Sequence, residues 1–438
     1  MSRSIGLDFG TTNSALALAL SPEDGGTVSL AHFTQGSGTT DTFRSILYFD
    51  PHDRDKRGRP VALAGPAAIA RYLASDGSGR LMQSLKSQLA SRLFHSTMIA
   101  GRTWTLEELI AVILTSLRAE AESRVGPLGR RVVCGRPVRF THAETADDDA
   151  FAIGRLRAAM AAAGFEEVVF EYEPVAAAYH YERDLDHDEL VLIADFGGGT
   201  SDFCLVRVGP SVRGKKRKSS DILGTEGVAL AGDAFDSEIV SHVVSPALGL
   251  DSRYVLPMDQ DGKTMPIPPW IYQKLRRWHH LSFLKSKETK ELLEELRKQA
   301  VEPHKIEALI HLVEADLGFH LYKAVERTKV SLSREDASDF RFDDPPIEID
   351  QRVPRASFDA WITEELRQIE RCVDRLLDKT GVPRSAVDRV FLTGGSSLVP
   401  AVRGLFAARF GEDKLRAGDE LTSVALGLSL RARDEGWA

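Results

Sequence analysis

A short hairpin near the start of the chain constrains the fold more than any other feature. Residues 5–15 read I-G-L-D-F-G-T-T-N-S-A, so an apolar strand enters a polar turn of small residues before an apolar run resumes. This pattern predicts a phosphate-binding hairpin, because the turn offers close backbone approach, hydroxyls and an amide to an anion. The turn residues are Gly10, Thr11, Thr12 and Asn13. Asp8 would repel a phosphate at contact distance, so we predict that it holds Mg²⁺ through water.

Two later glycine turns favour this interpretation over an ordinary hairpin rich in small residues. Residues 195–202 read D-F-G-G-G-T-S-D and again place an acid, glycines and a threonine between apolar strands. We predict that this second hairpin grips the same polyphosphate, through Gly197, Gly198, Gly199 and Thr200. A third turn, Gly394-Gly395-Ser396, comes just before a helix expected from about Pro400, where unpaired N–H groups favour phosphate or ribose oxygens.

The order of these motifs resembles the nucleotide-binding domain of the seventy-kilodalton heat-shock chaperones, the DnaK-like branch of the actin and sugar-kinase superfamily. The matching stretches are 5–14, 132–140, 173–178, 195–202, 232–236, 391–400 and 419–427. The resemblance implies an α/β, actin-like ATPase fold with two RNase-H-like lobes and a cleft between them for ATP or ADP with Mg²⁺. Lobe I would be residues 1–186 with a return at 418–438, and lobe II residues 187–417.

Several side-chain roles follow from the resemblance alone. Asp8 and Asp195 would place hydrated Mg²⁺, while Glu173 and Thr200 would orient the attacking water. The nucleoside contacts implied by the family pattern are Glu326, Lys329 and Ser333.

Three positions depart from the family pattern. Ile69 stands where the family has a lysine directed at the transferred phosphate, and losing one such donor costs about 10² to 10³ in rate. The sequence therefore predicts slow hydrolysis, unless Arg71 or Lys86 substitutes. Val330 and Leu398 replace two arginines that sandwich the adenine in the family, each worth about 1 kcal/mol, so we expect weaker ATP affinity and a relaxed base preference.

Composition excludes several classes of protein. The net charge of −8 argues against nucleic acid or an anionic membrane as the main partner, and the basic run 213–218 is interpreted as a hairpin tip. The cysteines, Cys134, Cys204 and Cys372, are far apart, which disfavours a disulfide framework or a zinc site, and the first two are expected to be buried in strands. Without a signal peptide or a long apolar segment, the chain is expected to be cytoplasmic.

The region 250–325 is longer than the family pattern. Helices are expected at 270–284, 286–299 and 303–332, and the acids of 259–262 fit a calcium loop poorly. Trp270, Trp278 and Phe283 are expected to pack these helices together, with a surface for a protein partner as the alternative. Elsewhere, helices are expected at 105–125, with a Thr105/Glu108 capping box, at 143–164 and at 358–379.

Three functions stay open at this point. The first is a chaperone-like ATPase with no substrate-binding domain and with slow or absent hydrolysis. The second is a nucleotide-binding scaffold without turnover, favoured by Ile69, Val330 and Leu398. The third is a small-molecule kinase of the same superfamily, which would need a general-base carboxylate facing a substrate pocket.

Overall fold

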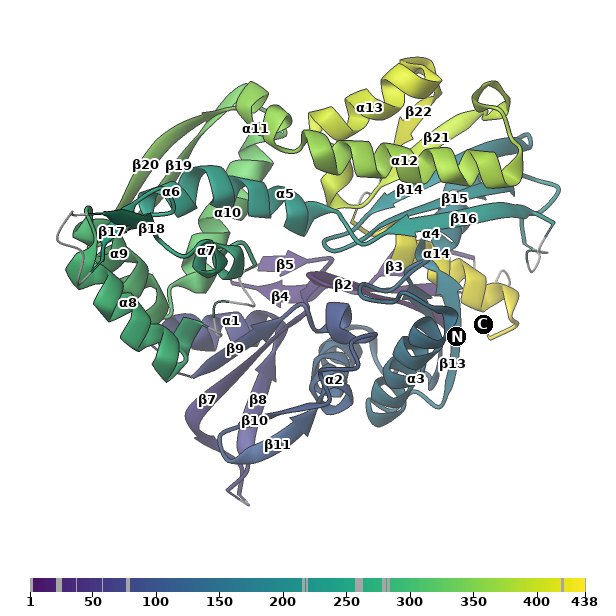
Figure 1. Ribbon diagram of the computed structural model, residues 1–438. Coiled ribbons are helices and arrows are strands. Elements are labelled where there is room, and N and C mark those ends of the chain that lie inside the picture. The colour runs from purple at the N-terminus through teal and green to yellow at the C-terminus, as the bar shows by residue number, and fades with distance from the viewer. Residues whose placement is uncertain are drawn as a thin grey trace. The chain divides into compact units, whose positions relative to one another are not determined.

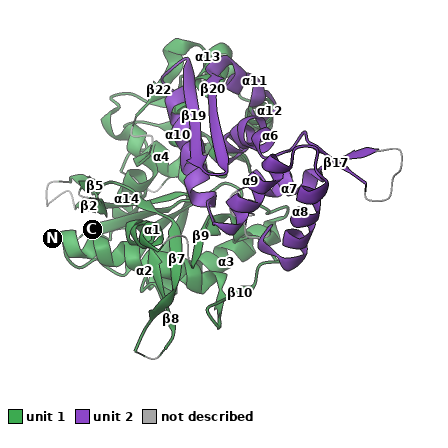
Figure 2. Ribbon diagram, turned by 90° about the vertical axis from the view of Figure 1, so that its left-hand side faces the viewer, with its two compact units in different colours: residues 1–232, 366–438 green, residues 233–365 purple. Residues whose placement is uncertain are grey.

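The computed structural model describes residues 3–20, 26–36, 38–56, 58–75, 79–214, 217, 220–256, 263–277, 281, 284–418 and 421–437. The chain divides into two compact units, coloured separately in Figure 2: unit 1 comprises residues 1–232 and 366–438, and unit 2 comprises residues 233–365. The division into lobes expected from the sequence is a different one and stays a prediction.

The first sheet of unit 1 is built on the predicted N-terminal hairpin. Its strand order is β13-β12-β1-β2-β3, with β6 also paired to β2. Strands β1 and β2 are antiparallel, and β12 adds to β1 in parallel. The strands are β1 (Arg3–Phe9), β2 (Asn13–Leu20), β3 (Val28–Leu30), β6 (Phe43–Arg44), β12 (Arg131–Arg136) and β13 (Glu167–Tyr172).

The second sheet of unit 1 repeats the connectivity of the first. Its order is β16-β15-β14-β21-β22, in which β14 and β15 form the central antiparallel hairpin and β21 adds to β14 in parallel. All eight residues of β14 are buried, as its continuous apolar run requires. The strands are β14 (Glu189–Phe196), β15 (Ser201–Val208), β16 (Ile222–Val228), β21 (Arg389–Thr393) and β22 (Leu415–Ala417). Each sheet thus carries one glycine-bearing hairpin at its centre.

Two helices of unit 1, α4 (Glu173–Tyr181) and α14 (Ser423–Asp434), lie side by side (Figure 1). Helix α14 also packs on β1 and β2. A Cβ atom at Gly427 would lie 1.7 Å from the Ala176 carbonyl oxygen, and one at Gly6 would lie 2.2 Å from the Ser429 nitrogen. Only glycine permits such close approach of backbone to backbone.

The remaining elements of unit 1 surround the two sheets. The predicted capping box of α2 is present, since the Thr105 side chain accepts from the Glu108 N–H and Glu108 accepts from the Thr105 N–H. All three cysteines are free and buried, as predicted for Cys134 and Cys204. The other helices and strands are β4 (Phe33–Gln35), β5 (Gly38–Thr40), β7 (Ile46–Arg54), β8 (Pro60–Ala64), α1 (Gly65–Ala74), β9 (Arg80–Gln83), the 3₁₀ turn η2 (Leu85–Gln88), β10 (Ser96–Ile99), β11 (Arg102–Thr105), α2 (Leu106–Val125), α3 (Ala146–Ala162) and α13 (Pro400–Phe410).

Unit 2 is mainly helical and carries one two-stranded sheet formed by β19 and β20 and another formed by β17 and β18. Its elements are α5 (Gly232–Ile239), the π-helix at Val240–Val244, α6 (Ser245–Ala247), β17 (Arg253–Val255), β18 (Thr264–Pro266), α7 (Pro269–Leu275), α8 (Lys287–Gln299), α9 (Pro303–Glu314), α10 (Gly318–Leu332), β19 (Ala337–Asp344), β20 (Ile347–Pro354) and α11 (Arg355–Trp361). Helix α12 (Thr363–Thr380) leads back to unit 1.

Two long helices expected from the sequence are each interrupted. The helix expected at 303–332 is split into α9 and α10, because Asp316 adopts the left-handed conformation with φ of 55°. The helix expected at 358–379 is split at Ile362, which closes α11 with ψ of 10°. The helix expected at 270–284 ends already at Leu275.

Other expectations for the connecting regions have mixed outcomes. The acids of 259–262, Trp278 and Phe283 lie outside the described residues, and Trp270 is 40% exposed, so it packs only in part. In the basic run, Arg213 donates to the carbonyl oxygens of Glu182, Arg183 and Leu185. Arg217 forms a 2.7 Å ion pair with Glu182, with both side chains 2% exposed. Arg217 is therefore buried against Glu182, whereas Arg213 stays exposed in the connection between the antiparallel strands β15 and β16, where the hairpin tip was expected.

Candidate functional site

The three glycine turns meet within unit 1. A Cβ atom at Gly199 in the second turn would lie 3.6 Å from the Thr11 hydroxyl of the first. The third turn packs directly on the second, since a Cβ atom at Gly394 would lie 2.2 Å from the Phe196 carbonyl oxygen. The Ser396 hydroxyl also donates to the Gly197 carbonyl oxygen at 3.2 Å. Segments almost 400 residues apart in sequence thus share one location.

Local pairing explains how each turn is held. In the second turn, the Gly197 N–H donates to the Thr200 carbonyl oxygen at 2.9 Å and closes the hairpin. In the first turn, the Thr12 carbonyl oxygen accepts from the Ser45 N–H at 2.9 Å. Arg44 donates to the Asn13 side-chain oxygen at 3.3 Å, so the amide nitrogen of Asn13 is the end that can donate to an anion.

A cluster of acids lies beneath these turns, comprising Asp8, Glu173, Asp195 and Asp202, which we call the acid cluster. Burial and repulsion from Glu173 raise the pKa of Asp8 to about 7, against an opposing effect of Lys86. Burial raises the pKa of Asp195 well above its usual value, helped by repulsion from Glu173, Asp8 and Asp202. The pKa of Asp202 is raised to about 7 by burial and by Glu173. These mutual effects indicate that the four carboxyls are close neighbours.

One buried lysine accompanies the acid cluster. The Lys86 ammonium donates to the Glu173 carboxylate at 2.6 Å, with the two side chains 8% and 9% exposed. Burial lowers the pKa of Lys86, but attraction to Glu173 and Asp8 outweighs this effect and leaves the pKa raised. Four carboxyls against one ammonium leave an excess of potential negative charge, which suits a bound cation such as Mg²⁺. In the described part of the chain, no group of three or more His, Cys, Asp or Glu side chains is arranged to hold a metal directly.

Of the two other positions considered for the missing cation, one holds an uncharged side chain and the other pairs with acids outside the acid cluster. Ile69 is half-buried in α1 and offers no charge. Arg71, also in α1, forms a 2.8 Å ion pair with Asp50 and a 3.4 Å ion pair with Asp53, and its side chain is 42% exposed. Arg71 is therefore committed to the acids of β7.

The residues expected to contact a nucleoside lie in unit 2, Glu326 and Lys329 on α10 and Ser333 at its C-terminal cap. Lys329 forms a 2.8 Å ion pair with Asp236, and the Ser333 hydroxyl donates to the Lys329 carbonyl oxygen at 3.2 Å. Burial raises the pKa of Asp236 to about 6, although Lys329 opposes the shift. Glu326 pairs with a lysine one turn earlier in the same helix at 3.1 Å, and Val330 is 51% exposed.

Sequence reasoning missed Asp202 and left Lys86 as one of two alternatives. Asp202 is the second acid of the D-F-G-G-G-T-S-D turn, and its carboxylate accepts from the Val138 N–H at 2.7 Å. The burial of Lys86 could have been predicted from the sequence, because Lys86 lies between the apolar residues Leu85 and Leu89, which are both buried. Burying a charged side chain between apolar core residues costs free energy unless an opposite charge pairs with it. The position of Lys86 therefore indicates that it has a carboxylate partner.

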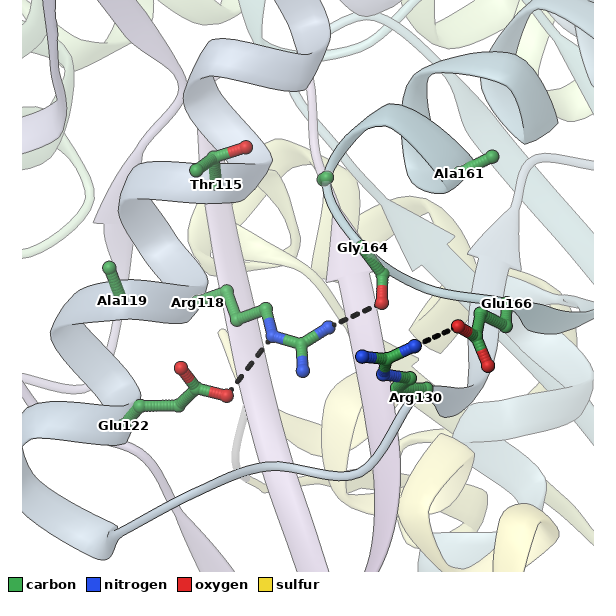
Figure 3. Close-up of a pocket in the computed structure, with 9 residues that line it drawn as sticks. Thr115, Arg118, Ala119, Glu122, Arg130, Ala161, Gly164 and Glu166 are labelled. Carbon is green, nitrogen blue, oxygen red and sulfur yellow. Dashed lines mark hydrogen bonds and ion pairs between the residues drawn. The ribbon is translucent and has the colours of Figure 1, made fainter.

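A separate hollow on unit 1 lies between α2 and α3 (Figure 3) and contains none of the predicted site residues. Arg118 pairs there with Glu122 at 3.1 Å and donates to the Gly164 carbonyl oxygen at 2.8 Å. Arg130 pairs with Glu166. The charges of this hollow are thus matched among its own residues.

Two sheets of identical strand order, each with a glycine-bearing hairpin at its centre, define the actin-like ATPase class of α/β proteins, as predicted. Within that class, the family model described as Hsp70 protein matches residues 73–251 and 291–433, so this chain belongs to the Hsp70 family. The chain is 25% identical over 431 residues to the protein named Chaperone protein DnaK from Thermosipho africanus. That alignment covers 98% of this chain and 58% of the relative, so the chain spans little more than half the length of the relative.

Every helix within the described ranges is too short or too polar to cross a membrane.

Proposed function

We propose that this chain binds ATP or ADP with Mg²⁺ where the three glycine turns meet. The observation that carries the proposal is the contact of Gly199 with Thr11 on one side and of Gly394 with Phe196 on the other. Turns of small residues let the backbone come close to phosphate oxygens, and the neighbouring acid cluster is suited to a hydrated cation.

In this proposal each turn has a separate task. Residues 10–13 and 197–199 bind the phosphates, while residues 394–396 bind phosphate or ribose oxygens. Asp8 and Asp195 hold the water ligands of Mg²⁺, which when bound would neutralise charge on the phosphates. Glu173 and Thr200 orient the attacking water. The nucleoside contacts assigned to Glu326, Lys329 and Ser333 rest on the family resemblance.

The activity that we propose is ATP hydrolysis of the chaperone type, consistent with membership of the Hsp70 family and with the printed name of the relative. Ile69, in α1, has no positive charge to offer the transferred phosphate. If the site depends on α1 for that charge, ATP hydrolysis should be slow. A scaffold that binds nucleotide without turnover is the second candidate. It is favoured by the half-exposed aliphatic side chains of Val330 and Leu398, which replace two arginines of the family pattern.

Calorimetry followed by a phosphate-release assay tests these functions. ATP and ADP are titrated into the protein with Mg²⁺ or with EDTA, and phosphate release is then followed without and with candidate acceptors. Release without an acceptor supports the ATPase, and tight binding without release supports the scaffold. A rate that depends on an acceptor supports the kinase. Absence of binding to either nucleotide contradicts all three.

A further inference from the structure

Strand β6 lies beside the first glycine turn and presents Arg44 to it. This strand pairs with the start of β2 in antiparallel register, so Arg44 is directly opposite Asn13, the only asparagine in the chain. The next residue, Ser45, donates its N–H to the Thr12 carbonyl oxygen at 2.9 Å. Two consecutive residues next to the turn thus contact two consecutive residues within it.

The core of unit 1 holds this segment in place on both sides of Arg44. Before it, Phe43 is 1% exposed, and its ring packs edge-on against the Phe33 ring with the centroids 5.3 Å apart. After it, the buried hydroxyls of Ser45 and Ser14 are 2.8 Å apart and share a hydrogen bond. Because a buried residue precedes and follows Arg44, its backbone has little freedom to move away from the turn.

The contact between Arg44 and Asn13 selects one orientation of the Asn13 amide. The Arg44 Nη1 atom donates to the Asn13 side-chain oxygen at 3.3 Å. A guanidinium has only donors, whereas an asparagine amide accepts at its oxygen and donates at its nitrogen. Arg44 can therefore pair only with the oxygen, and the nitrogen of the amide is the end that donates to a further partner.

This orientation matters for the binding of a phosphate. Fully ionised phosphate oxygens only accept hydrogen bonds, so an amide that turned its oxygen toward them would repel the anion instead of binding it. The terminal torsion of asparagine is broad and roughly two-fold, so the side chain by itself hardly favours one orientation over the other. A neighbour that fixes the amide before the ligand arrives removes this ordering cost from the free energy of binding.

We infer that Arg44 is a positioning residue of the proposed nucleotide site, which fixes the Asn13 amide so that its nitrogen donates to a phosphate of ATP or ADP. The inference rests on the proposed function and adds a residue to it. Arg44 lies outside every stretch of the sequence that resembles the family pattern. Because the contact is to phosphate, it serves ATP, ADP and a polyphosphate without a nucleoside alike.

A double-mutant cycle tests the inference. Asn13→Ala removes the amide, Arg44→Met removes its partner, and a third variant carries both substitutions. Calorimetry in excess Mg²⁺ measures the affinities for ATP, ADP and inorganic tripolyphosphate. Each single substitution should weaken the binding of all three about tenfold, the size of one hydrogen bond to a charged group. The double variant should bind within about twofold of Asn13→Ala, because Arg44 acts only through the amide.

Two further substitutions of Arg44 separate selection of the amide orientation from simple contact. Arg44→Lys should keep the affinities within about threefold of the wild type, because an ammonium also has only donors. Arg44→Gln should lose as much affinity as Arg44→Met, since glutamine can pair with either end of the Asn13 amide. It also replaces Arg44→Met in the cycle if that variant does not unfold cooperatively.

Arg102→Met is the matched control. It removes one positive charge from β11 of unit 1, where the guanidinium donates to Glu108 at 2.9 Å, and it should leave all three affinities unchanged.

Several results would overturn the inference. Losses that add up in the double variant do so, because Arg44 would then act on the anion or on the turn without Asn13. An unchanged affinity in Arg44→Met also does so and leaves the proposed function intact. A loss for ATP that is absent for tripolyphosphate has the same meaning, since the contact would then be to the nucleoside. A wild-type protein that binds neither nucleotide overturns the proposed function, and the inference with it.

Discussion

Asp195 lies directly opposite Asp202 across the antiparallel strands β14 and β15. Like charges in this cross-strand position repel one another, and both side chains are buried. The pair is tolerable when one carboxyl keeps its proton or when a cation compensates the charge. The same register places Asp195 beside Thr393 of β21, so one strand pairing brings the second hairpin next to the third turn.

Asp202 is expected to make the stability of the nucleotide-free protein depend on pH. The pKa of Asp202 is about 7 in the folded protein, and its ordinary value is 3.8. Between these two pH values the folded state keeps a proton that the unfolded state has lost. Stability from this group is therefore greatest below about pH 4 and is lost as the pH rises through 7. A shift of about three units corresponds to no more than about 4 kcal/mol.

Asp202→Asn removes this ionisation and keeps an acceptor for the Val138 N–H. Urea unfolding at a series of pH values without Mg²⁺ should show that the free energy of unfolding falls less between pH 5 and 8 in the variant than in the wild type. Asp147→Asn, at an exposed acid of α3, is the matched control and should follow the wild type. Parallel curves for Asp202→Asn and the wild type would contradict the pKa assigned to Asp202.

Asp8→Asn should uncouple nucleotide binding from Mg²⁺. The variant loses a carboxylate for the waters of the ion, but it also loses a negative charge that repels phosphate. We therefore expect ATP affinity to fall about tenfold with Mg²⁺, a difference of about 1.4 kcal/mol, and to be unchanged or higher in EDTA. Calorimetry in both buffers measures this, with Asp147→Asn as control. If Mg²⁺ strengthens ATP binding equally in Asp8→Asn and the wild type, Asp8 does not hold the ion.

Gly394→Ala should disrupt the third turn. Gly394 has φ of 81°, and an added Cβ atom would collide with the Phe196 carbonyl oxygen at 2.2 Å. We expect a loss of at least about 2 kcal/mol in the free energy of unfolding, and weaker ADP binding in whatever fraction folds. Gly404→Ala is the control, because Gly404 lies in α13 with no heavy atom within 4 Å of a built Cβ. That variant should be stabilised by about 0.5 to 1 kcal/mol. Equal effects of the two substitutions would show that the third turn tolerates a side chain.

Leu398→Arg should strengthen ATP binding by restoring a guanidinium to a position that is 50% exposed. Stacking on the base is worth about 1 kcal/mol, or about fivefold in affinity. Inorganic tripolyphosphate, which has no base, separates stacking from simple charge attraction, and its affinity should not change. Leu73→Arg adds the same charge at another half-exposed leucine and should leave ATP binding as it was. An equal gain for ATP and tripolyphosphate would argue against a base contact at Leu398.

The sequence predicted those parts of the fold that depend on local pattern. The hairpin at Asp8 and the hairpin at Asp195 are visible because their strands are continuous apolar runs interrupted by glycine and threonine. The capping box at Thr105 is equally local. The break at Asp316 could not be predicted, because a single aspartate in the left-handed conformation leaves the apolar periodicity on either side almost unchanged.

The side-chain environment of the candidate site was harder to predict, because it depends on contacts between distant segments. Lys86 and Glu173 are 87 positions apart, and only the tertiary fold makes them partners. Whether these residues act on a nucleotide stays a prediction.

The contact of Gly6 with Ser429 has a consequence for how the protein is made. Strand β1 leaves the ribosome long before α14 is translated, yet the two are so close that no side chain fits between them at Gly6. Until α14 arrives, one face of the first hairpin stays open to solvent and to other nascent chains. Folding of the first hairpin in this member of a chaperone family therefore cannot be completed until α14 has been synthesised.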